Sequence, residues 1–276
     1  MNVAGEIAVV TGGASGIGRG TALALARAGA DIVLADIHAE RLATTSEDIR
    51  RLGRRVLAVQ CDVSNDEDVA RLADDVEAEL GPVGLLMNNA GVVLRGALEE
   101  ISLADWQWCF GINVFGVIRC IRAFLPGMIA RRHGWIVNTG SVAGLVALTG
   151  EGAPYVASKF AVVGLSEALA LYCRPFGIGV SLLCPGGVRT NLAETGRSIG
   201  MTPEREVAET RMAQTVQGGE ELDPARVGSL VVSAVQNETF LVLPEPEIHG
   251  ELVRRRAADL NLFLAERFAE VAREQP

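Results

Sequence analysis

The sequence is short of lysine, tyrosine and histidine. Among its 25 basic residues only Lys159 is a lysine, the two tyrosines are Tyr155 and Tyr172, and there are three histidines. The histidines are not paired at short spacing and the five cysteines form no C-x-x-C pair, so the sequence predicts no metal site and no disulfide framework. We expect reduced, mostly buried thiols.

Long uncharged apolar runs are also missing, because no stretch approaches the roughly eighteen residues that cross a bilayer. The N-terminus lacks the basic start of a signal peptide. Acidic residues outnumber basic ones by 34 to 25, and a net charge of -9 disfavours binding to nucleic-acid phosphates. We therefore expect a cytoplasmic protein that binds neither membrane nor nucleic acid.

Short, uniformly apolar runs alternate with longer stretches of helical spacing, which is typical of parallel strands covered on both faces. The sequence predicts an α/β fold: a single doubly wound domain of the Rossmann type, with a seven-stranded parallel sheet and helices on both faces. The predicted strands are 7–10, 32–35, 56–59, 85–87, 135–137, 180–183 and 240–243, and the helices are 16–28, 39–52, 65–80, 103–131, 154–174 and 223–235. One domain would span 1–276, with a core over 5–245 and a helical tail over 247–276.

A glycine-rich segment joins the first predicted strand to the first helix and includes Gly12, Ser15, Gly16, Ile17 and Gly18. Glycines at such a turn let the backbone approach a pyrophosphate, and the helix N-terminus offers free N–H groups to it. The alternative is a tight strand-to-helix turn without a ligand.

Asp36 ends the second predicted strand, where a carboxylate can accept hydrogen bonds from the adenosine ribose. The same carboxylate repels a 2′-phosphate, and neither Ser15 nor Ile37 supplies a cation, so the sequence favours NAD over NADP. An exposed aspartate at a strand end without a ligand is the alternative.

The only lysine follows a tyrosine by four residues, Tyr155 and Lys159, which places both on one face of a helix. An ammonium close to a phenol favours the phenolate, and bringing the pKa from about 10 to neutral requires a shift of roughly two to three units. We expect Lys159 to lower the pKa of Tyr155 and to make it a general acid and base. A surface helix pair is the alternative.

These residues, together with Asn88 to Gly91, Asn113, Ser141 and the segment Pro185 to Thr190, resemble the short-chain dehydrogenase/reductase family over about residues 5–245. The resemblance implies that Tyr155 exchanges a proton with the substrate oxygen and that Ser141 hydrogen-bonds the same atom. Lys159 would bind the nicotinamide ribose, and Asn113 would hold a water that relays protons to Lys159. Taken alone, Ser141 is typical of a strand-end hydroxyl that caps local backbone, and Asn113 is typical of a buried amide that holds a helix in place.

The resemblance also implies further contacts to the dinucleotide. Asp62 and Val63 would lie at the adenine, and Asn89, Ala90 and Gly91 at the ribose. The nicotinamide and pyrophosphate would contact Pro185, Gly186, Val188 and Thr190.

The substrate region is predicted from apolar residues near the chemistry, namely Val93, Leu145, Leu148 and Leu192. They favour an apolar, bulky secondary alcohol or ketone. In the family, the segment corresponding to 191–219 closes over substrate as a lid; an ordinary surface excursion is the alternative. The strand that leads into the tail is similar to members that oxidise bulky aryl or alicyclic alcohols, including lignin-type aryl ether alcohols. The family's helix pairing implies a homotetramer or homodimer.

The leading prediction is an NAD-dependent alcohol dehydrogenase or ketone reductase that acts on CH–OH groups. Two alternatives stay open: an NADPH-dependent ketoacyl-type reductase, which Asp36 disfavours, and a nucleotide-sensing protein of the same fold without turnover. Sugar-nucleotide epimerases share the tyrosine and lysine, but are usually longer.

Overall fold

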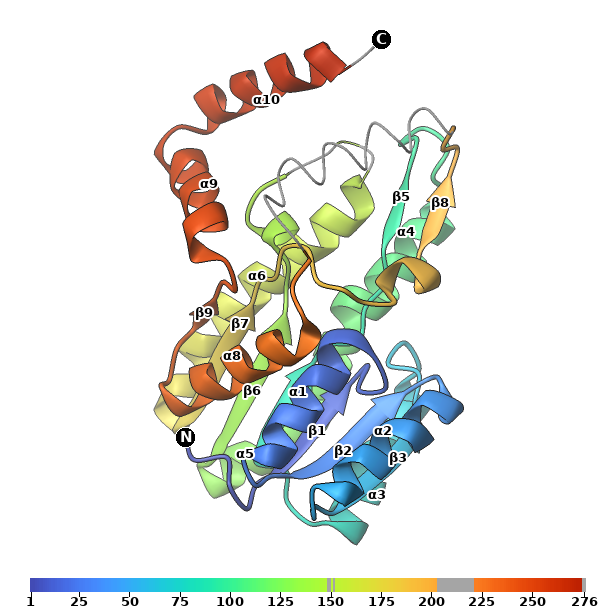
Figure 1. Ribbon diagram of the computed structural model, residues 1–276, viewed down its shortest axis with the longest axis vertical. Coiled ribbons are helices and arrows are strands. Elements are labelled where there is room, and N and C mark those ends of the chain that lie inside the picture. Colours follow the sequence, from blue (N-terminus) through green and yellow to red (C-terminus); the bar gives the residue numbers. More distant parts are fainter. Residues whose placement is uncertain (148–149, 151, 203–220, 275–276) are drawn as a thin grey trace.

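A seven-stranded parallel sheet runs through the computed structural model, which describes residues 1–147, 150, 152–202 and 221–274 (Figure 1). The strand order is β3-β2-β1-β4-β6-β7-β9. The strands are β1 (Ile7–Thr11), β2 (Asp31–Asp36), β3 (Val56–Gln60), β4 (Leu85–Asn88), β6 (Gly134–Thr139), β7 (Ile178–Leu183) and β9 (Leu241–Val242). All seven predicted strands are confirmed, and the chain order reverses direction between β1 and β4, where doubly wound sheets bind ligands.

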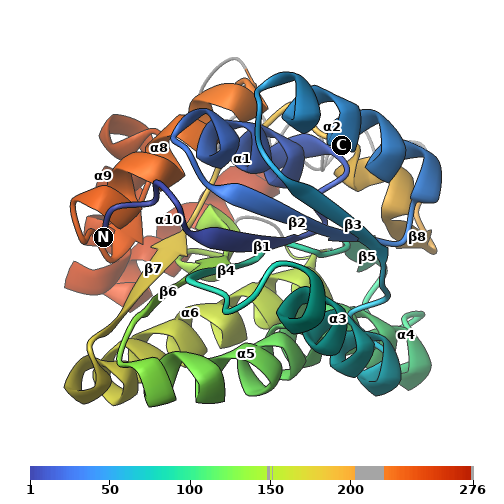
Figure 2. The same ribbon diagram turned by 90° about the horizontal axis from the view of Figure 1, so that it is seen from below.

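Helices cover both faces of this sheet, as predicted (Figure 2). One face carries α1 (Gly16–Arg27), α2 (Ala39–Arg51) and α8 (Pro224–Gln236), and the other carries α3 (Asp66–Glu79), α5 (Val117–Arg131) and α6 (Ala153–Cys173). Each layer of helices forms its own apolar core against the sheet. Strands β1, β2, β4 and β6 are buried along their whole length, which explains the apolar runs within them, such as 32–35 in β2.

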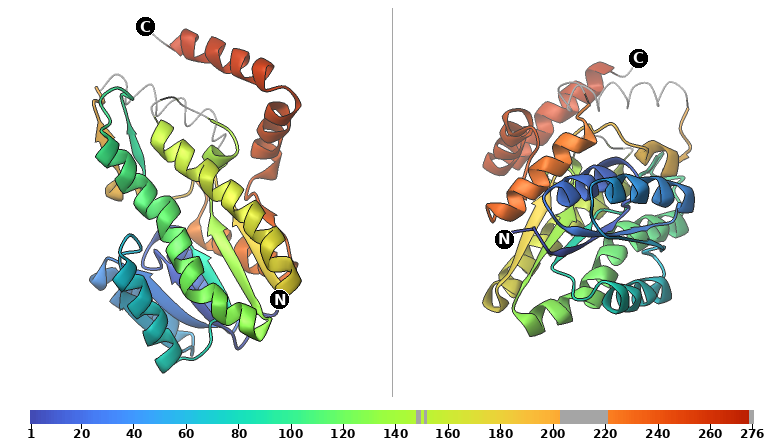
Figure 3. Two further views of the ribbon diagram at one scale, coloured as in Figure 1. Left: turned by 180° about the vertical axis from the view of Figure 1, so that it is seen from behind. Right: turned by 60° about the horizontal axis from the view of Figure 1, so that its bottom comes forward.

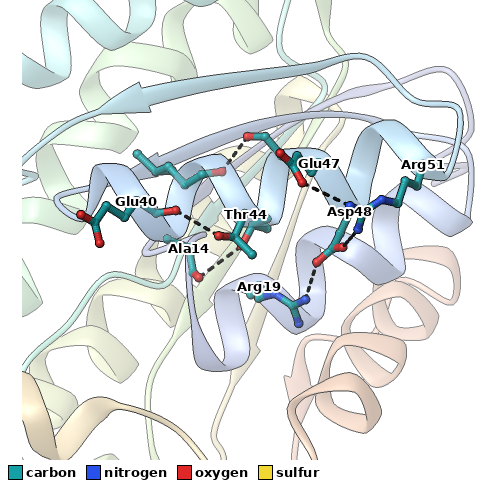
Figure 4. Close-up of polar contacts among 10 residues, drawn as sticks. Ala14, Arg19, Glu40, Thr44, Glu47, Asp48 and Arg51 are labelled. Atoms are coloured by element: carbon teal, nitrogen blue, oxygen red, sulfur yellow. Dashed lines mark hydrogen bonds and ion pairs between the residues drawn. The ribbon is translucent and has the colours of Figure 1, made fainter.

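Polar contacts fix α1 against α2 beside the glycine-rich turn (Figure 4). The Arg19 guanidinium on α1 pairs with the Asp48 carboxylate on α2 at 2.6 Å, and Arg51 pairs with Asp48 at 2.8 Å. The Thr45 hydroxyl donates to the carbonyl of Ala14 within the turn itself. The turn is therefore held from the side by α2.

A second, small sheet was not predicted. Strands β5 (Leu94–Gly96) and β8 (Arg197–Ile199) pair in parallel apart from the main sheet. Strand β8 lies in the segment 191–219, where the sequence predicted no strand. A Cβ at Gly96 would lie 2.0 Å from the Ile199 carbonyl oxygen, so the two strands meet only because position 96 is glycine. Residues 203–219 of the predicted lid lie outside the described residues.

The predicted helix over 103–131 is three segments: α4 (Leu103–Phe110), the π-helix η1 (Gly111–Gly116) and α5. A π-turn widens the helix by one residue, and such turns are frequent at functional sites. Here the widened turn places Asn113 in the interior.

The tail is not one helix but two, α9 (Pro246–Ala258) and α10 (Leu260–Glu274). Asp259 between them is extended, and the two helices run in different directions (Figure 3). Phe263 of α10 is buried against Val142 and Val146, whereas Phe268 is exposed. The tail therefore packs beside the segment that follows β6.

Two helical stretches, Leu103–Arg131 and Ala153–Phe176, are long and apolar enough to cross a membrane by length and composition. The search of the sequence for long uncharged apolar runs missed both stretches, because a few charged residues interrupt each of them. Phe124 and Val162 from these helices share a buried cluster with Ile136 of β6. The core of the fold accounts for the buried part of these helices, which is 44% and 39% of the two apolar windows.

Candidate active site

A cavity of about 440 Å³ opens at the carboxyl ends of the sheet strands. Most of the predicted site residues line it, including Gly12, Ser15, Gly16, Ile17, Asp36, Asp62, Val63, Asn89, Ala90, Gly91, Ser141, Tyr155, Lys159, Pro185, Gly186, Val188 and Thr190. The predicted residues Gly18 and Asn113 do not line it. One elongated site thus unites groups that are far apart in the sequence.

Three glycines make room at the start of α1. A Cβ at Gly12 would lie 3.0 Å from the Cα of Ala90, one at Gly16 would lie 2.9 Å from Cγ2 of Thr190, and one at Gly18 would lie 2.1 Å from the Gly12 carbonyl oxygen. Gly12 and Gly16 also adopt φ values of 63° and 49°, which other residues rarely adopt. This close backbone at a helix N-terminus fits a dinucleotide pyrophosphate.

Asp36 faces the cavity from the end of β2. Its Oδ2 accepts the backbone N–H of Ala14 at 3.1 Å and its Oδ1 accepts that of His38 at 3.0 Å. Arg41, which the sequence did not single out, lines the same end, and its guanidinium pairs with the Glu194 carboxylate at 2.9 Å. The Asp36 carboxylate is thus held in place, and the charge of the nearby Arg41 is paired with Glu194.

Asn89 joins the ends of β1 and β4. Its side-chain amide donates to the carbonyls of Thr11 and Gly12 at 3.1 and 3.3 Å, while the Thr11 hydroxyl accepts the N–H groups of Asn89 and Ala90. At the predicted adenine end, Asp62 accepts hydrogen bonds from Ser64. Asn89 and Ala90 are thus held against the end of β1, and Asp62 is held within its own turn.

The segment after β7 forms the opposite wall. The Pro185 carbonyl accepts the N–H of Val142 at 3.0 Å. Leu222 pairs with Val188, donates its N–H to the Gly187 carbonyl and accepts that of Arg189. The loop is therefore held by backbone hydrogen bonds to two distant segments.

Tyr155 lies at the far end of the cavity, in the first turns of α6. Burial raises the pKa of Tyr155 to about 12, and a hydrogen bond with the Ser141 side chain opposes this rise. The Ser141 hydroxyl also accepts the N–H of Ala143 at 3.1 Å, at the start of the short helix η2 (Val142–Gly144). Ser141 thus both caps η2 and contacts the phenol.

Lys159 lies one helical turn further along, with its ammonium 5.6 Å from the centroid of the Tyr155 ring. The ammonium donates to the Thr139 carbonyl at 2.9 Å, and burial lowers the pKa of Lys159 to about 8. Burial is also the largest influence on the pKa of Tyr155. In the chain alone, desolvation therefore determines the direction of the shift, and the lowering of the phenol pKa by Lys159 stays a prediction.

Asn113 is buried, and all its polar atoms have partners. Its Oδ1 accepts the Val92 N–H at 2.8 Å, and its Nδ2 donates to the Val92 carbonyl at 2.9 Å and to the Ser158 hydroxyl at 3.0 Å. Ser158 in turn donates to the Tyr155 carbonyl. The amide thus holds the segment after β4 against α6, which was the alternative that the sequence left open. The water relay stays a prediction.

Apolar side chains also line the cavity. Leu192 lines the cavity as predicted, whereas Val93 and Leu145 do not, and Leu148 lies outside the described residues. Trp108 joins Leu192 there, and the Arg197 guanidinium lies 3.9 Å from the centroid of its ring.

Sequence reasoning missed a further set of lining residues: Ile37, His38, Arg41, Cys61, Val92, Trp108, Ile112, Thr139, Gly140, Asn191 and Thr195. A signal was present for two of them. Trp108 and Ile112 are four residues apart, on one helix face, directly before Asn113.

Comparison with known proteins gives consistent matches. Residues 6–198 match the family model described as short chain dehydrogenase. The chain is 34% identical over 264 residues to a C alpha-dehydrogenase from Sphingobium sp. (strain NBRC 103272 / SYK-6), covering 93% of this chain and 86% of the relative. It is 37% identical over 191 residues to the (2S)-[(R)-hydroxy(phenyl)methyl]succinyl-CoA dehydrogenase subunit BbsD from Thauera aromatica, covering 69% and 76%.

Among solved structures, a short chain dehydrogenase/reductase from Burkholderia phymatum in complex with NAD superposes with a TM-score of 0.86. The two chains are 38% identical, and the match covers 95% of this chain and 96% of the other. The similarity therefore extends into the tail.

Proposed function

Because the chain belongs to the short-chain dehydrogenase/reductase family, we propose that it transfers a hydride between NAD and an apolar, bulky secondary alcohol or ketone. One observation carries this proposal: a single cavity joins the glycine turn and Asp36 at one end to Tyr155, Ser141 and Lys159 at the other. A bound nicotinamide would supply the hydride acceptor or donor.

The protein's own part is to move a proton at the substrate oxygen. The Tyr155 phenol exchanges that proton, and the Ser141 hydroxyl holds the oxygen by a hydrogen bond. Since burial raises the pKa of Tyr155 to about 12, positive charge is needed to favour the phenolate. The buried Lys159 ammonium, 5.6 Å from the Tyr155 ring centroid, is one source, and an oxidised nicotinamide is the other.

NAD rather than NADP is proposed on the charge at the adenosine end. Asp36 presents a carboxylate to the cavity, and the guanidinium of Arg41 is paired with Glu194. Among the described residues that line this end, Arg41 is the arginine and its charge is paired, so a 2′-phosphate would meet the carboxylate with little to offset the repulsion.

The substrate class is proposed on the apolar end of the cavity. Val92, Trp108, Ile112 and Leu192 line it, and an indole face suits a planar apolar group. The name of the Thauera relative specifies a hydroxyl next to a phenyl ring. We therefore favour secondary alcohols whose carbinol carbon carries an aryl ring.

We also propose that the protein is a homotetramer or homodimer in the cytoplasm, assembled through the outer faces of α4 to α6. Leu103, Phe115, Leu171 and Tyr172 are exposed on these helices, and apolar surface of this kind marks subunit contacts. Light scattering on the purified protein measures the assembly, and a monomer at micromolar concentration would contradict it.

The function is tested by following NAD and NADP reduction with a panel of aryl and alkyl secondary alcohols. We expect Tyr155→Phe to lower kcat by about 10²- to 10⁴-fold while NADH binding is retained, because only the proton transfer is lost. Tyr172→Phe is the matched control, since that ring is exposed and packs on Phe176. Full activity in Tyr155→Phe, or turnover with NADP alone, would contradict the proposal.

A further inference from the structure

His249 of α9 is fully buried, and neither of its ring nitrogens has a hydrogen-bond partner among the described residues. A buried polar group without partners lowers stability, and an apolar side chain would fill the same space at lower cost. Burial lowers the pKa of His249, against the opposing charge of Glu245, which favours the neutral ring. Stability alone does not explain a histidine at this position.

The ring lies directly behind Gly186 in the loop that follows β7. A Cβ at Gly186 would lie 2.4 Å from Cε1 and 2.8 Å from Nε2 of His249, and its three nearest neighbours would all be atoms of this ring. Gly186 is not among the glycines with positive φ, so its backbone conformation is open to other residues. The His249 ring is therefore what restricts position 186 to glycine.

The remaining contacts hold the loop at its ends but not at Gly186. Val142 bonds to Pro185 on one side, and Leu222 bonds to Gly187 and Arg189 on the other. The front of Gly186 lines the cavity, so the imidazole is a rigid support behind the exposed backbone.

The support is anchored in turn. The backbone N–H of His249 donates to the Glu245 carbonyl at 3.0 Å. Leu252, further along α9, packs with Val142 and Phe263. The tail thus connects the loop after β7 to the segment that carries Ser141.

We propose that His249 is a positioning residue, which holds the Gly186 backbone where the nicotinamide end of the dinucleotide binds. This inference rests on the proposed function, since it takes the loop after β7 as the nicotinamide wall. It makes the tail a part of the site rather than an addition to the fold.

Binding of two ligands separates positioning from a general structural role. NADH contains the nicotinamide, whereas ADP-ribose contains only the adenosine, pyrophosphate and ribose. We expect His249→Ala to weaken NADH binding by about tenfold or more and to leave the dissociation constant of ADP-ribose within about twofold of wild type. Titration calorimetry measures both, and Glu247→Ala, at an exposed position of the same helix, is the control, expected to change neither.

A double-mutant cycle with Gly186→Ala tests the contact itself. The added methyl group would collide with the ring, so Gly186→Ala should weaken NADH binding as well. In the double variant the ring is absent and the added methyl group has room. The loss of NADH affinity in the double variant should therefore be smaller than the product of the losses in the two single variants. Losses of NADH affinity that simply multiply would overturn the proposal. If His249→Ala fails to fold, Gly186→Ala alone tests whether NADH binding is lost while ADP-ribose binding is kept.

Failure of the inference is distinguishable from failure of the proposed function. A wild-type protein that binds neither NADH nor ADP-ribose would contradict the function. A wild type that binds both, with a His249→Ala variant that loses neither or loses both equally, would overturn the role of His249 alone.

Discussion

At one end of the cavity many of the lining groups come from short, continuous pieces of sequence, namely Gly12 to Ile17 and the end of β2 at Asp36. At the other end, Val92, Trp108, Tyr155 and Leu192 come from four separate segments. At the first end the backbone packs so closely that a Cβ at Gly18 would lie 2.1 Å from the Gly12 carbonyl oxygen. The second is held by side chains, as in the stacking of Arg197 on Trp108.

This difference predicts how each end responds to substitution. Backbone contacts leave no space for adjustment, so one added carbon at the glycine turn should affect every ligand that binds there. Side-chain contacts can rearrange, so changes at the apolar end should alter the choice of substrate and leave dinucleotide binding intact.

The largest effect is expected from Gly18→Ala. The new methyl group would lie 2.1 Å from the Gly12 carbonyl oxygen and 2.6 Å from Nδ2 of Asn89, neither of which can move freely. Affinity for both NADH and ADP-ribose should fall by about 10²-fold or more. Gly164→Ala on α6 is the control, since nothing lies within 4 Å of its Cβ position. Equal binding by the two variants would show that the turn is not rigid.

A smaller effect is expected from Asp36→Asn, which removes the charge but keeps the shape. Hydrogen bonds to a charged group contribute about 1.5–3 kcal/mol, so NAD should bind roughly 10- to 100-fold more weakly. NADP should bind to Asp36→Asn more tightly than to wild type. Adding Glu194→Gln, which releases Arg41 from its ion pair, should increase the affinity for NADP further. Measured dissociation constants for both dinucleotides check this, and an unchanged ratio would remove Asp36 from the selection.

The same contrast explains how far the sequence predicts the molecule. The seven-stranded sheet and the glycine turn follow from local rules: apolar runs, helix N-termini and glycines where backbones meet. Tyr155 and Lys159 stand out because the chain uses tyrosine and lysine so rarely. Such signals lie within one segment, so no knowledge of the packing is needed to find them.

The groups that the sequence did not reveal depend on contacts between segments. Trp108 on α4 and Arg41 on α2 line the cavity only through the way these helices pack in the fold. Strand β8 exists only because β5 accepts it beside Gly96. The pKa of Tyr155 depends on burial, which the spacing of tyrosine and lysine does not contain.

At the apolar end, Trp108→Ala is expected to raise KM for aryl secondary alcohols by about tenfold, since stacking and burial of a ring contribute about 1–2 kcal/mol. KM for small alkyl alcohols and binding of NADH should change less than about twofold. Steady-state kinetics on both substrate groups measure this. A uniform change in KM would mean that the indole supports the cavity wall without contacting the substrate.

The smallest effect concerns Lys159 and the pH dependence of stability. Burial lowers the pKa of Lys159 to about 8 from an unfolded value near 10.4, so above pH 8 the unfolded chain binds more protons and rising pH stabilises the fold. The buried thiols act in the opposite direction, because burial raises the pKa of Cys61 to about 11 and ionisation then favours the unfolded chain. Only the difference between wild type and Lys159→Met isolates the lysine.

Lys159→Met should melt at or above the wild-type temperature at pH 7.5, because it removes the cost of a buried ammonium. From pH 8 to 9.5 the wild type should gain up to about 2 kcal/mol relative to the variant, which corresponds to roughly 2 to 5 °C in Tm. Thermal melts of both proteins across this range measure the gain. A constant difference would mean that the ammonium keeps its charge throughout, stabilised by the Thr139 carbonyl, and would support its direct influence on Tyr155.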